Sequence, residues 1–258
     1  AAYLPVDPAH PVERVRRVLA EAAPVLLVTA PGAEPLGADL PTLVLDENAW
    51  ADEPLPASGH PDTTGAAHVI HTSGSTGTPK GVIVTHAGVA ALTAGLVDGT
   101  ALGAGSRVLQ LGPPTFDISV GEMCLAFGSG GTLVLPPRGP LVGDALADVL
   151  TGLRISCAFV PPSVLATVPP GPHPELRTLL VGAESCPPDL IARWTAGGRR
   201  LHNAYGPTEA TVVSTLSAPL AADGTAPPVG TPLPGTGAYV LDERLRPVPA
   251  GVSGELYL

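Results

Sequence analysis

The sequence predicts an α/β protein in which helices flank mostly parallel sheets and antiparallel β hairpins follow at the end. Short apolar runs that suit buried strands alternate with segments whose apolar residues recur at helical spacing. After Thr211 the pattern changes to short β segments broken by Pro and Gly. With 258 residues, of which 45% are hydrophobic, the chain can bury a substantial core.

Each element follows from a local pattern. Val15, Val18, Leu19 and Ala22 recur at helical spacing within 12–23, and the apolar runs at 25–28 and 42–45 predict buried strands. Pro, Asp and Glu over 46–64 predict an exposed connection. We further expect helices at 86–96, 120–127, 144–153, 163–168 and 188–196, and strands at 67–70, 81–84, 108–111, 132–135, 155–160, 179–181, 238–241 and 254–258, the last two joined across a turn at Asp242–Glu243.

Three parts are expected along the chain. Residues 1–65 would form a partial first α/β subdomain with a connection, 66–215 a larger α/β subdomain, and 216–258 the truncated start of a β-rich subdomain. The chain opens abruptly and stops inside an apolar strand. We therefore expect both ends to be cuts in a longer protein.

Composition narrows the classes of partner. Thirteen Lys and Arg against 23 Asp and Glu give a formal charge of -10, which opposes binding to nucleic acid. No apolar run approaches the ~20 residues that span a bilayer, and the start lacks the features of a signal peptide, so a soluble cytoplasmic protein is expected. The three cysteines lack CxxC spacing, which indicates ordinary reduced thiols.

A glycine-rich segment between Thr72 and Gly81 suits phosphate binding. Three glycines alternate with hydroxyl residues, and Lys80 adds a positive charge, so backbone N–H groups can curl around an anion. It is not a Walker loop, because Pro79 precedes Lys80 and glycine follows it. Composition alone leaves a polar, flexible turn equally open.

A second segment, residues 203–209, combines groups that suit a nucleotide and a metal. Tyr205 can stack on a purine, Asn203 can pair with the purine's exocyclic edge, and Thr208 can donate to a phosphate. Glu209 can hold Mg²⁺ through oxygen. The alternative is a β-turn in which Tyr205 packs and Glu209 is solvated.

Together the two segments resemble a known family. Residues 71–81 are similar, nearly residue for residue, to the phosphate-binding signature of the adenylate-forming superfamily, which includes acyl- and aryl-CoA ligases and luciferase. With residues 203–209 the chain resembles the N-terminal core of the adenylation domains of nonribosomal peptide synthetases; residues 2–8 and 254–257 also resemble family segments.

The resemblance implies an ATP- and Mg²⁺-dependent ligase of antibiotic or other secondary metabolism. It would turn an amino acid and ATP into aminoacyl-AMP and pyrophosphate, and pass the aminoacyl group to a peptidyl carrier protein with a phosphopantetheine arm. A small MbtH-like activating protein is a further implied partner. The implied catalytic residues are Lys80, Thr208 and Glu209, with Glu209 on the metal, and the implied ATP-binding residues are Thr72, Ser73, Gly74, Ser75, Thr76, Gly77, Lys80, Gly182, Ala183, Asn203, Tyr205 and Thr208.

Asp117 lies where those domains carry a Phe-Asp step whose carboxylate grips the substrate's α-ammonium. An Asp among apolar residues is costly unless it is paired, and an ammonium is a suitable partner. The alternative is an Asp that caps a helix starting near Ser119. Acyl- and aryl-acid-activating relatives generally lack this Asp, so its presence favours an α-amino acid.

Matching the family's motifs onto this sequence implies an amino-acid pocket that is apolar apart from Asp117. A hydrophobic substrate side chain is therefore expected, closest to leucine. Gly121 stands where many relatives carry a large aromatic residue, which deepens the pocket and favours a longer or aromatic side chain. The implied lining is Asp117, Ile118, Gly121, Phe159, Leu180, Gly182, Ala204, Val212 and Val213.

Two other functions stay open. One is a carboxylic acid–CoA ligase. The other is a catalytically incomplete fragment that binds nucleotide or a partner protein without turnover. The second arises because the family's ribose-binding motif and its small C-terminal domain, which bears a lysine, are expected after Leu258.

Overall fold

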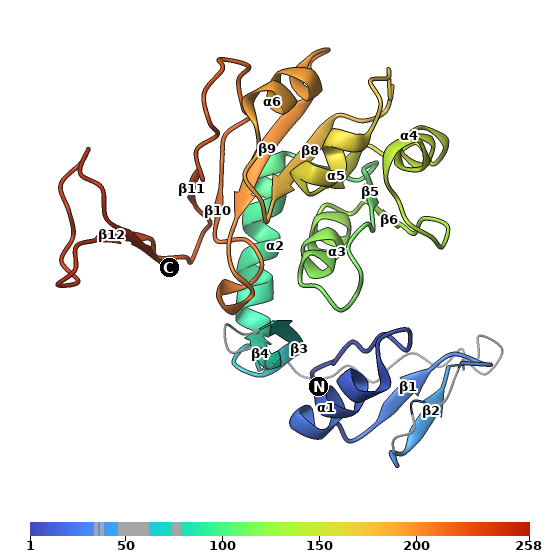
Figure 1. The fold of residues 1–258 in the computed structure, drawn as a ribbon. Coiled ribbons are helices and arrows are strands. Elements are labelled where there is room, and N and C mark those ends of the chain that lie inside the picture. The colour runs from blue at the N-terminus through green and yellow to red at the C-terminus, as the bar shows by residue number, and fades with distance from the viewer. Residues whose placement is uncertain (34–35, 37–38, 46–61, 74–78) are drawn as a thin grey trace. The chain divides into compact units, whose positions relative to one another are not determined.

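The computed structural model describes residues 1–33, 36, 39–45, 62–73 and 79–258 (Figure 1). The chain divides into two compact units, residues 1–87 and 88–258. The subdomain boundaries expected near residues 65 and 215 stay predictions.

The first unit contains one helix and two small sheets. Helix α1, Val12–Ala22, buries Val15 and Val18 as its apolar spacing predicts. Strands β1, Leu27–Thr29, and β2, Thr42–Val44, pair in parallel, whereas β3, Ala66–Ser73, and β4, Pro79–Thr85, form an antiparallel hairpin.

The expectations of buried strands at 25–28 and 42–45 are wrong. Val25 and Val28 are 87% and 52% exposed. Leu43 and Val44 are 48% and 50% exposed. The reason is the size of the sheet, since each of the two strands has only one neighbour in the described residues.

The second unit is built around a seven-stranded sheet in the order β11-β10-β9-β8-β7-β5-β6 (Figure 1). The five strands β9, β8, β7, β5 and β6 run parallel to one another. Strands β10 and β11 add an antiparallel edge beside β9. Its strands are β5 Arg107–Leu109, β6 Thr132–Val134, β7 Cys157–Phe159, β8 Thr178–Gly182, β9 Arg200–Tyr205, β10 Thr215–Leu216 and β11 Thr231–Pro232. The mostly parallel α/β fold expected from the sequence is confirmed.

The helices follow the expected order. They are α2 His86–Thr100, which begins at the boundary between the units, α3 Ile118–Gly128, α4 Gly143–Gly152, α5 Pro162–Thr167 and α6 Pro188–Thr195. Helices α4, α5 and α6 share one core cluster with the sheet residues Leu179, Val181 and Leu201. Because strand side chains alternate between faces, Leu180 points to the opposite face of β8.

Strand β9 was not predicted from the sequence. The sequence indicates a nucleotide motif at 203–205, with a β-turn as the alternative, but these residues form the end of β9, where Asn203 and Ala204 pair with β8 and Tyr205 pairs with β10. Polar Asn203 and His202 interrupt the apolar pattern that would have predicted a buried strand. The turn alternative is therefore wrong for these three residues.

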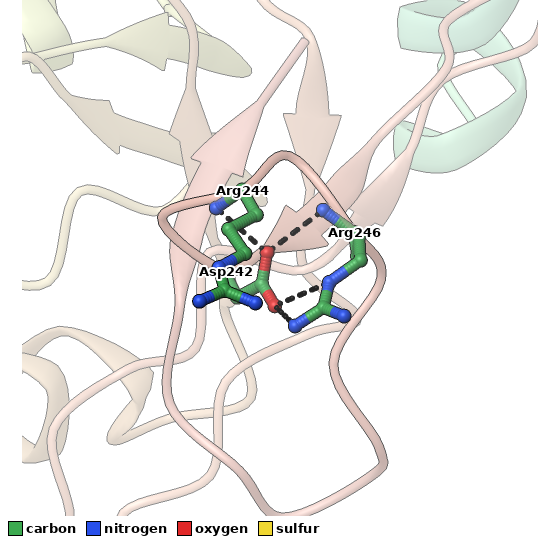
Figure 2. Close-up of polar contacts among 3 residues, drawn as sticks. All are labelled: Asp242, Arg244 and Arg246. Carbon is green, nitrogen blue, oxygen red and sulfur yellow. Dashed lines mark hydrogen bonds and ion pairs between the residues drawn. The ribbon is translucent and has the colours of Figure 1, made fainter.

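The chain ends in an antiparallel pair, β12 Tyr239–Leu241 and β13 Glu255–Tyr257, as predicted. The Asp242 side chain stabilises the turn that follows β12 by accepting hydrogen bonds from Arg244 and Arg246 (Figure 2). One carboxylate oxygen accepts the backbone N–H groups of Arg244 and Arg246 at 2.9 Å, and the other accepts two hydrogen bonds from the Arg246 guanidinium. The bonds from Arg246 and Arg244 lower the pKa of Asp242.

The state of the three cysteines agrees with the sequence prediction. Cys124, Cys157 and Cys186 are free and buried. Across the described ranges, no helix has the length and apolar character required to cross a membrane.

The close approach of two backbone segments at Gly230 gives a test of the fold. Gly230 has φ +92°, and a Cβ there would collide with the backbone of Leu216 and Ser217. We expect Gly230→Ala to lower the free energy of unfolding well beyond the ~1–3 kcal/mol of backbone strain alone. The matched control is Gly224→Ala, because Gly224 has φ +78° but open space at its Cβ. Equal losses in urea denaturation would contradict this packing.

Candidate functional site

The carboxyl ends of three parallel strands meet at one edge of the sheet. Phe159 pairs with Leu180, and Gly182 pairs with Ala204, so β7, β8 and β9 end side by side. In open α/β sheets, ligands bind outside this edge. Phe159, Gly182 and Tyr205, each predicted to bind substrate or nucleotide, are the last residues of these three strands.

A cavity of about 460 Å³ opens at this edge. Its wall combines the turn between β5 and α3 with the residues after β7 and β8. Three of the predicted pocket residues, Asp117, Ile118 and Phe159, line it, and so does Ala183, which was predicted to contact ATP. The other lining residues are Leu111, Gly112, Pro113, Phe116, Gly139, Leu141, Pro161 and Val164, so Asp117 carries the one charge of the lining.

Asp117 is half-buried and stands at the N-cap position of α3, but its side chain makes no capping hydrogen bond. The helix start is held by backbone bonds instead, since the Asp117 carbonyl oxygen accepts from Val120 at 2.9 Å and from Gly121 at 3.3 Å. The alternative interpretation of Asp117 as a side-chain cap is therefore wrong. Asp117 is one of the residues that line the cavity.

Glu122 supports the cavity wall from inside the protein. It is fully buried on α3, and its carboxylate accepts backbone hydrogen bonds from Leu111 at 3.0 Å and from Gly112 at 3.0 and 3.2 Å. Gln110 adds a side-chain bond of 2.9 Å. Burial raises the pKa of Glu122 to about 8, while these bonds oppose that rise.

Glu122 was not predicted from the sequence, although a signal was present. Glu122 is the one charged residue of α3, in a helix that is otherwise rich in Val, Leu, Met and Ala. A charged residue surrounded by apolar residues in a buried helix needs polar partners, which here come from the turn after β5.

The six other predicted pocket residues, Gly121, Leu180, Gly182, Ala204, Val212 and Val213, are buried but do not line this cavity. A Cβ at Gly182 would collide with the carbonyl oxygen of Ala204, so a side chain there would disturb the pairing of β8 with β9. Gly121 and Val212 face each other, because a Cβ at Gly121 would lie 3.4 Å from a Val212 methyl group.

The nucleotide segment is presented at the end of β9. Tyr205 is 42% exposed, as a stacking surface requires. The side-chain nitrogen of Asn203 donates to the Pro228 carbonyl at 2.9 Å, and this bond fixes the orientation of the Asn203 amide. Because the Pro228 carbonyl can only accept a hydrogen bond, its partner must be the amide nitrogen of Asn203. The amide oxygen of Asn203 is then left to accept a hydrogen bond from a ligand.

Thr208 and Glu209 follow on a short 3₁₀ turn, Thr208–Ala210. Glu209 is exposed. Within the described ranges, no three or more His, Cys, Asp or Glu side chains gather as a metal cage. A cation held by one carboxylate and by substrate phosphates, which is the usual arrangement for Mg²⁺, fits this chemistry.

A carboxylate also holds the loop that carries Ala183. Glu184 accepts hydrogen bonds from the backbone N–H and the hydroxyl of Ser163, at 3.0 and 2.9 Å. The bonds tie the end of β8 to the start of α5. Ala183 itself has φ +64°, a left-handed conformation that such anchoring can maintain.

The predicted phosphate loop connects β3 to β4 in the first unit. Thr72 and Lys80 pair across this hairpin, and Lys80 is exposed. Glu21 accepts the Gly81 N–H at 3.2 Å and lies 3.4 Å from the His71 ring, which anchors β4 and β3 beside the loop. The predicted contacts of Gly74, Ser75, Thr76 and Gly77, and the side chain of Ser73, lie outside the described residues.

The chain matches a family model and is similar to known proteins. The family model described as AMP-binding enzyme matches residues 1–258. The chain is 48% identical to the probable non-canonical nonribosomal peptide synthetase CymA of Salinispora arenicola, over 100% of this chain and 3% of that protein.

Two solved structures are similar over 99% of this chain. The AMPPNP-bound form of the nonribosomal peptide synthetase FmoA3 has a TM-score of 0.88 at 30% identity, with 29% of that chain covered. A nonribosomal peptide synthetase protein containing adenylation and PCP domains, bound to a vinylsulfonamide inhibitor, has a TM-score of 0.86 at 25% identity, with 45% covered. The chain thus spans less than half of each of these proteins.

Glu122 makes stability depend on pH. Its pKa is higher in the folded protein, about 8, than the ordinary 4.5, so the folded state binds more protons between these values. The stabilisation is complete below pH 4.5 and is lost as pH rises toward 8. We expect wild-type stability to fall relative to Glu122→Gln by about 1.4 kcal/mol per pH unit in this window.

Urea denaturation of both proteins at several pH values measures this difference. The control is Glu243→Gln, which removes an exposed carboxylate. Parallel pH curves for the wild type and Glu122→Gln would show that burial of Glu122 does not favour its protonated form.

Proposed function

The chain belongs to the AMP-binding enzyme family, and from that premise we propose that it activates a hydrophobic α-amino acid with ATP. The carboxylate of the amino acid attacks the α-phosphorus, which forms aminoacyl-AMP and releases pyrophosphate. The similarity to nonribosomal peptide synthetases supports this chemistry. It also supports amino-acid activation for peptide assembly as the role.

The observation that carries the proposal is the Asp117 carboxylate in an apolar cavity. The cavity offers it no second charge, and its side chain does not cap α3. A half-buried carboxylate gains most from a cationic partner that brings its own hydrogen-bond donors. The α-ammonium of an amino acid is such a partner, whereas a simple acyl acid has none to offer.

The remaining lining favours an apolar substrate side chain. Ile118, Phe159 and Val164 supply no hydrogen-bonding side-chain atoms, so a polar substrate side chain would be desolvated without compensation. We infer a leucine-like side chain or a larger, aromatic one. Gly121 supports the larger alternative, because a Cβ added there would have only a Val212 methyl group within 4 Å outside its own helix.

The residues at the end of β9 suit an adenine nucleotide. The Asn203 oxygen can accept from the exocyclic amino group of adenine, while the corresponding oxygen of guanine would repel it. Tyr205 would stack on the purine, with Gly182 and Ala183 along its edge through their backbones. Thr208 would donate to the α-phosphate.

Charge neutralisation would assist the departure of pyrophosphate. We assign Lys80, with Thr72 and the hydroxyls of the loop, to the leaving phosphates, where an exposed ammonium can balance their charge. Glu209 would hold Mg²⁺ together with the phosphates. When bound, this cation supplies further charge neutralisation.

The proposed carrier is a peptidyl carrier protein whose phosphopantetheine thiol receives the aminoacyl group. The similar structure that contains both adenylation and PCP domains supports this partner. A small MbtH-like activating protein is the further partner that the family resemblance suggests.

Pyrophosphate exchange into ATP across a panel of amino acids and acyl acids tests the function. Exchange with hydrophobic amino acids is expected. Exchange with acyl acids alone would favour a carboxylic acid–CoA ligase and contradict the role of Asp117. ATP binding without exchange for any acid would favour an incomplete nucleotide-binding fragment.

Removing the Asp117 carboxylate should separate amino-acid recognition from nucleotide binding. We expect Asp117→Ala to reduce amino-acid-dependent exchange by at least about 100-fold, because a buried ion pair loses one partner. ATP affinity, measured by calorimetry, should stay unchanged. Asp144→Ala is the control, since Asp144 is an exposed acid in the first turn of α4. Loss of ATP affinity in Asp117→Ala would show that Asp117 is structural.

Adding a methyl group at Gly121 should shift substrate preference. We expect Gly121→Ala to lower kcat/KM for phenylalanine relative to leucine by roughly tenfold, because the family resemblance, unlike the cavity lining, places Gly121 against the substrate side chain, where a methyl group would take up space. Stability should be unchanged or higher, because Ala favours the helix more than Gly. Gly152→Ala, in open space at the end of α4, is the control. An unchanged preference would place Gly121 away from the substrate side chain.

A further inference from the structure

A second cavity, of about 370 Å³, lies at the opposite, amino edge of the same parallel sheet. Arg107 is the first residue of β5, Arg200 is the first residue of β9, and Arg177 immediately precedes β8. All three line this cavity, together with Arg154. Four of the 13 Lys and Arg residues of the chain therefore surround one cavity.

Backbone hydrogen bonds fix the arginines in a row. Arg200 donates to the Arg177 carbonyl at 2.9 Å, and Arg177 donates to the Ser156 carbonyl at 3.0 Å. Ser156 in turn donates to the Arg107 carbonyl at 3.0 Å. Since neighbouring strands lie ~4.8 Å apart, the sheet itself holds these cationic residues close together.

The positive charges of this row are not balanced nearby. The one carboxylate that lines the cavity, Glu175, lies 3.5 Å from Arg154. The half-buried Arg107 and Arg200 donate to neutral oxygens, those of the Leu153 carbonyl and the Thr178 hydroxyl, each at 3.0 Å. In the described part of the chain, no ion pair involves Arg107, Arg177 or Arg200.

Such an arrangement is costly without an anion. Like charges on neighbouring strands repel each other, and a half-buried guanidinium loses hydration that a neutral oxygen only partly replaces. The cluster stands out because the chain as a whole carries a formal charge of -10. A bound anion would relieve both the repulsion and the desolvation.

We propose that this cavity is a binding site for a small phosphate-bearing molecule. A phosphate group carries up to two negative charges and several acceptor oxygens, so it can bond to more than one guanidinium at once. A single carboxylate would balance only one of them. The volume lies within the range of small-molecule sites.

The site is separate from the candidate ATP site. Arg200 and Tyr205 are the first and last residues of β9, and five residue steps along a parallel strand span roughly 16 Å. Phosphate bound at the amino edge therefore cannot be the phosphate of a nucleotide whose base stacks on Tyr205 at the carboxyl edge. The inference holds whether or not the chain activates amino acids.

Arginine side-chain NMR tests the proposal directly. Inorganic phosphate is titrated at constant ionic strength against chloride, while the Nε–Hε signals of Arg107 and Arg200 are followed. We expect saturable shifts of both signals. The double variant Arg107→Gln/Arg200→Gln should weaken phosphate binding at least tenfold, measured by calorimetry. A charge-matched control, Arg14→Gln/Arg244→Gln, removes two exposed arginines elsewhere and should bind as the wild type does.

Arg177→Gln keeps the test decisive if the double variant does not fold, because the Arg177 side chain is exposed. We expect this variant to fold and to weaken phosphate binding several-fold. A wider titration with phosphorylated metabolites then distinguishes free phosphate from an organic phosphate as the preferred ligand. Shifts that do not saturate, that chloride reproduces, or that persist at full affinity in the variants would overturn the proposal.

Discussion

The register of the parallel strands β7, β8 and β9 is the constraint on which both proposed sites depend. Its backbone hydrogen bonds pair Phe159 with Leu180 and Gly182 with Ala204, which brings three strand ends to one edge. The same ladder pairs Thr178 with Arg200 at the other edge. A one-residue shift in the register of one strand would turn its side chains to the opposite face of the sheet. The shift would also separate the residues that meet at the two edges.

The turn between β5 and α3 adds the recognition chemistry to this frame. It places Asp117 in the cavity lining, while the buried Glu122 holds the backbone N–H groups of Leu111 and Gly112. Two acids five residues apart thus have different roles. Asp117 reaches the cavity and can meet a cation, whereas Glu122 has three N–H donors around it and organises the wall.

Local patterns predicted most elements of the fold but few of the contacts in the sites. Helical spacing located α1, and apolar runs located β5 to β8, because burial leaves a periodic signal. Strand β9 was not predicted because its polar residues interrupt the apolar pattern. The exposure of residues 42–45 depends on the number of strands in their sheet, which a local sequence pattern does not indicate. Asp117 was predictable as an acid among apolar residues. The arginine row was not, because its members are far apart in sequence and only the strand order brings them together.

The central claim is that the carboxyl edge of the sheet binds an aminoacyl adenylate with its ammonium on Asp117. A crystal structure with a non-reactive analogue of a hydrophobic aminoacyl adenylate tests it most directly. We expect the analogue's ammonium at ~3 Å from the Asp117 carboxylate and its adenine stacked on Tyr205. An ammonium bound elsewhere, with the Asp117 carboxylate turned back to cap α3, would contradict it.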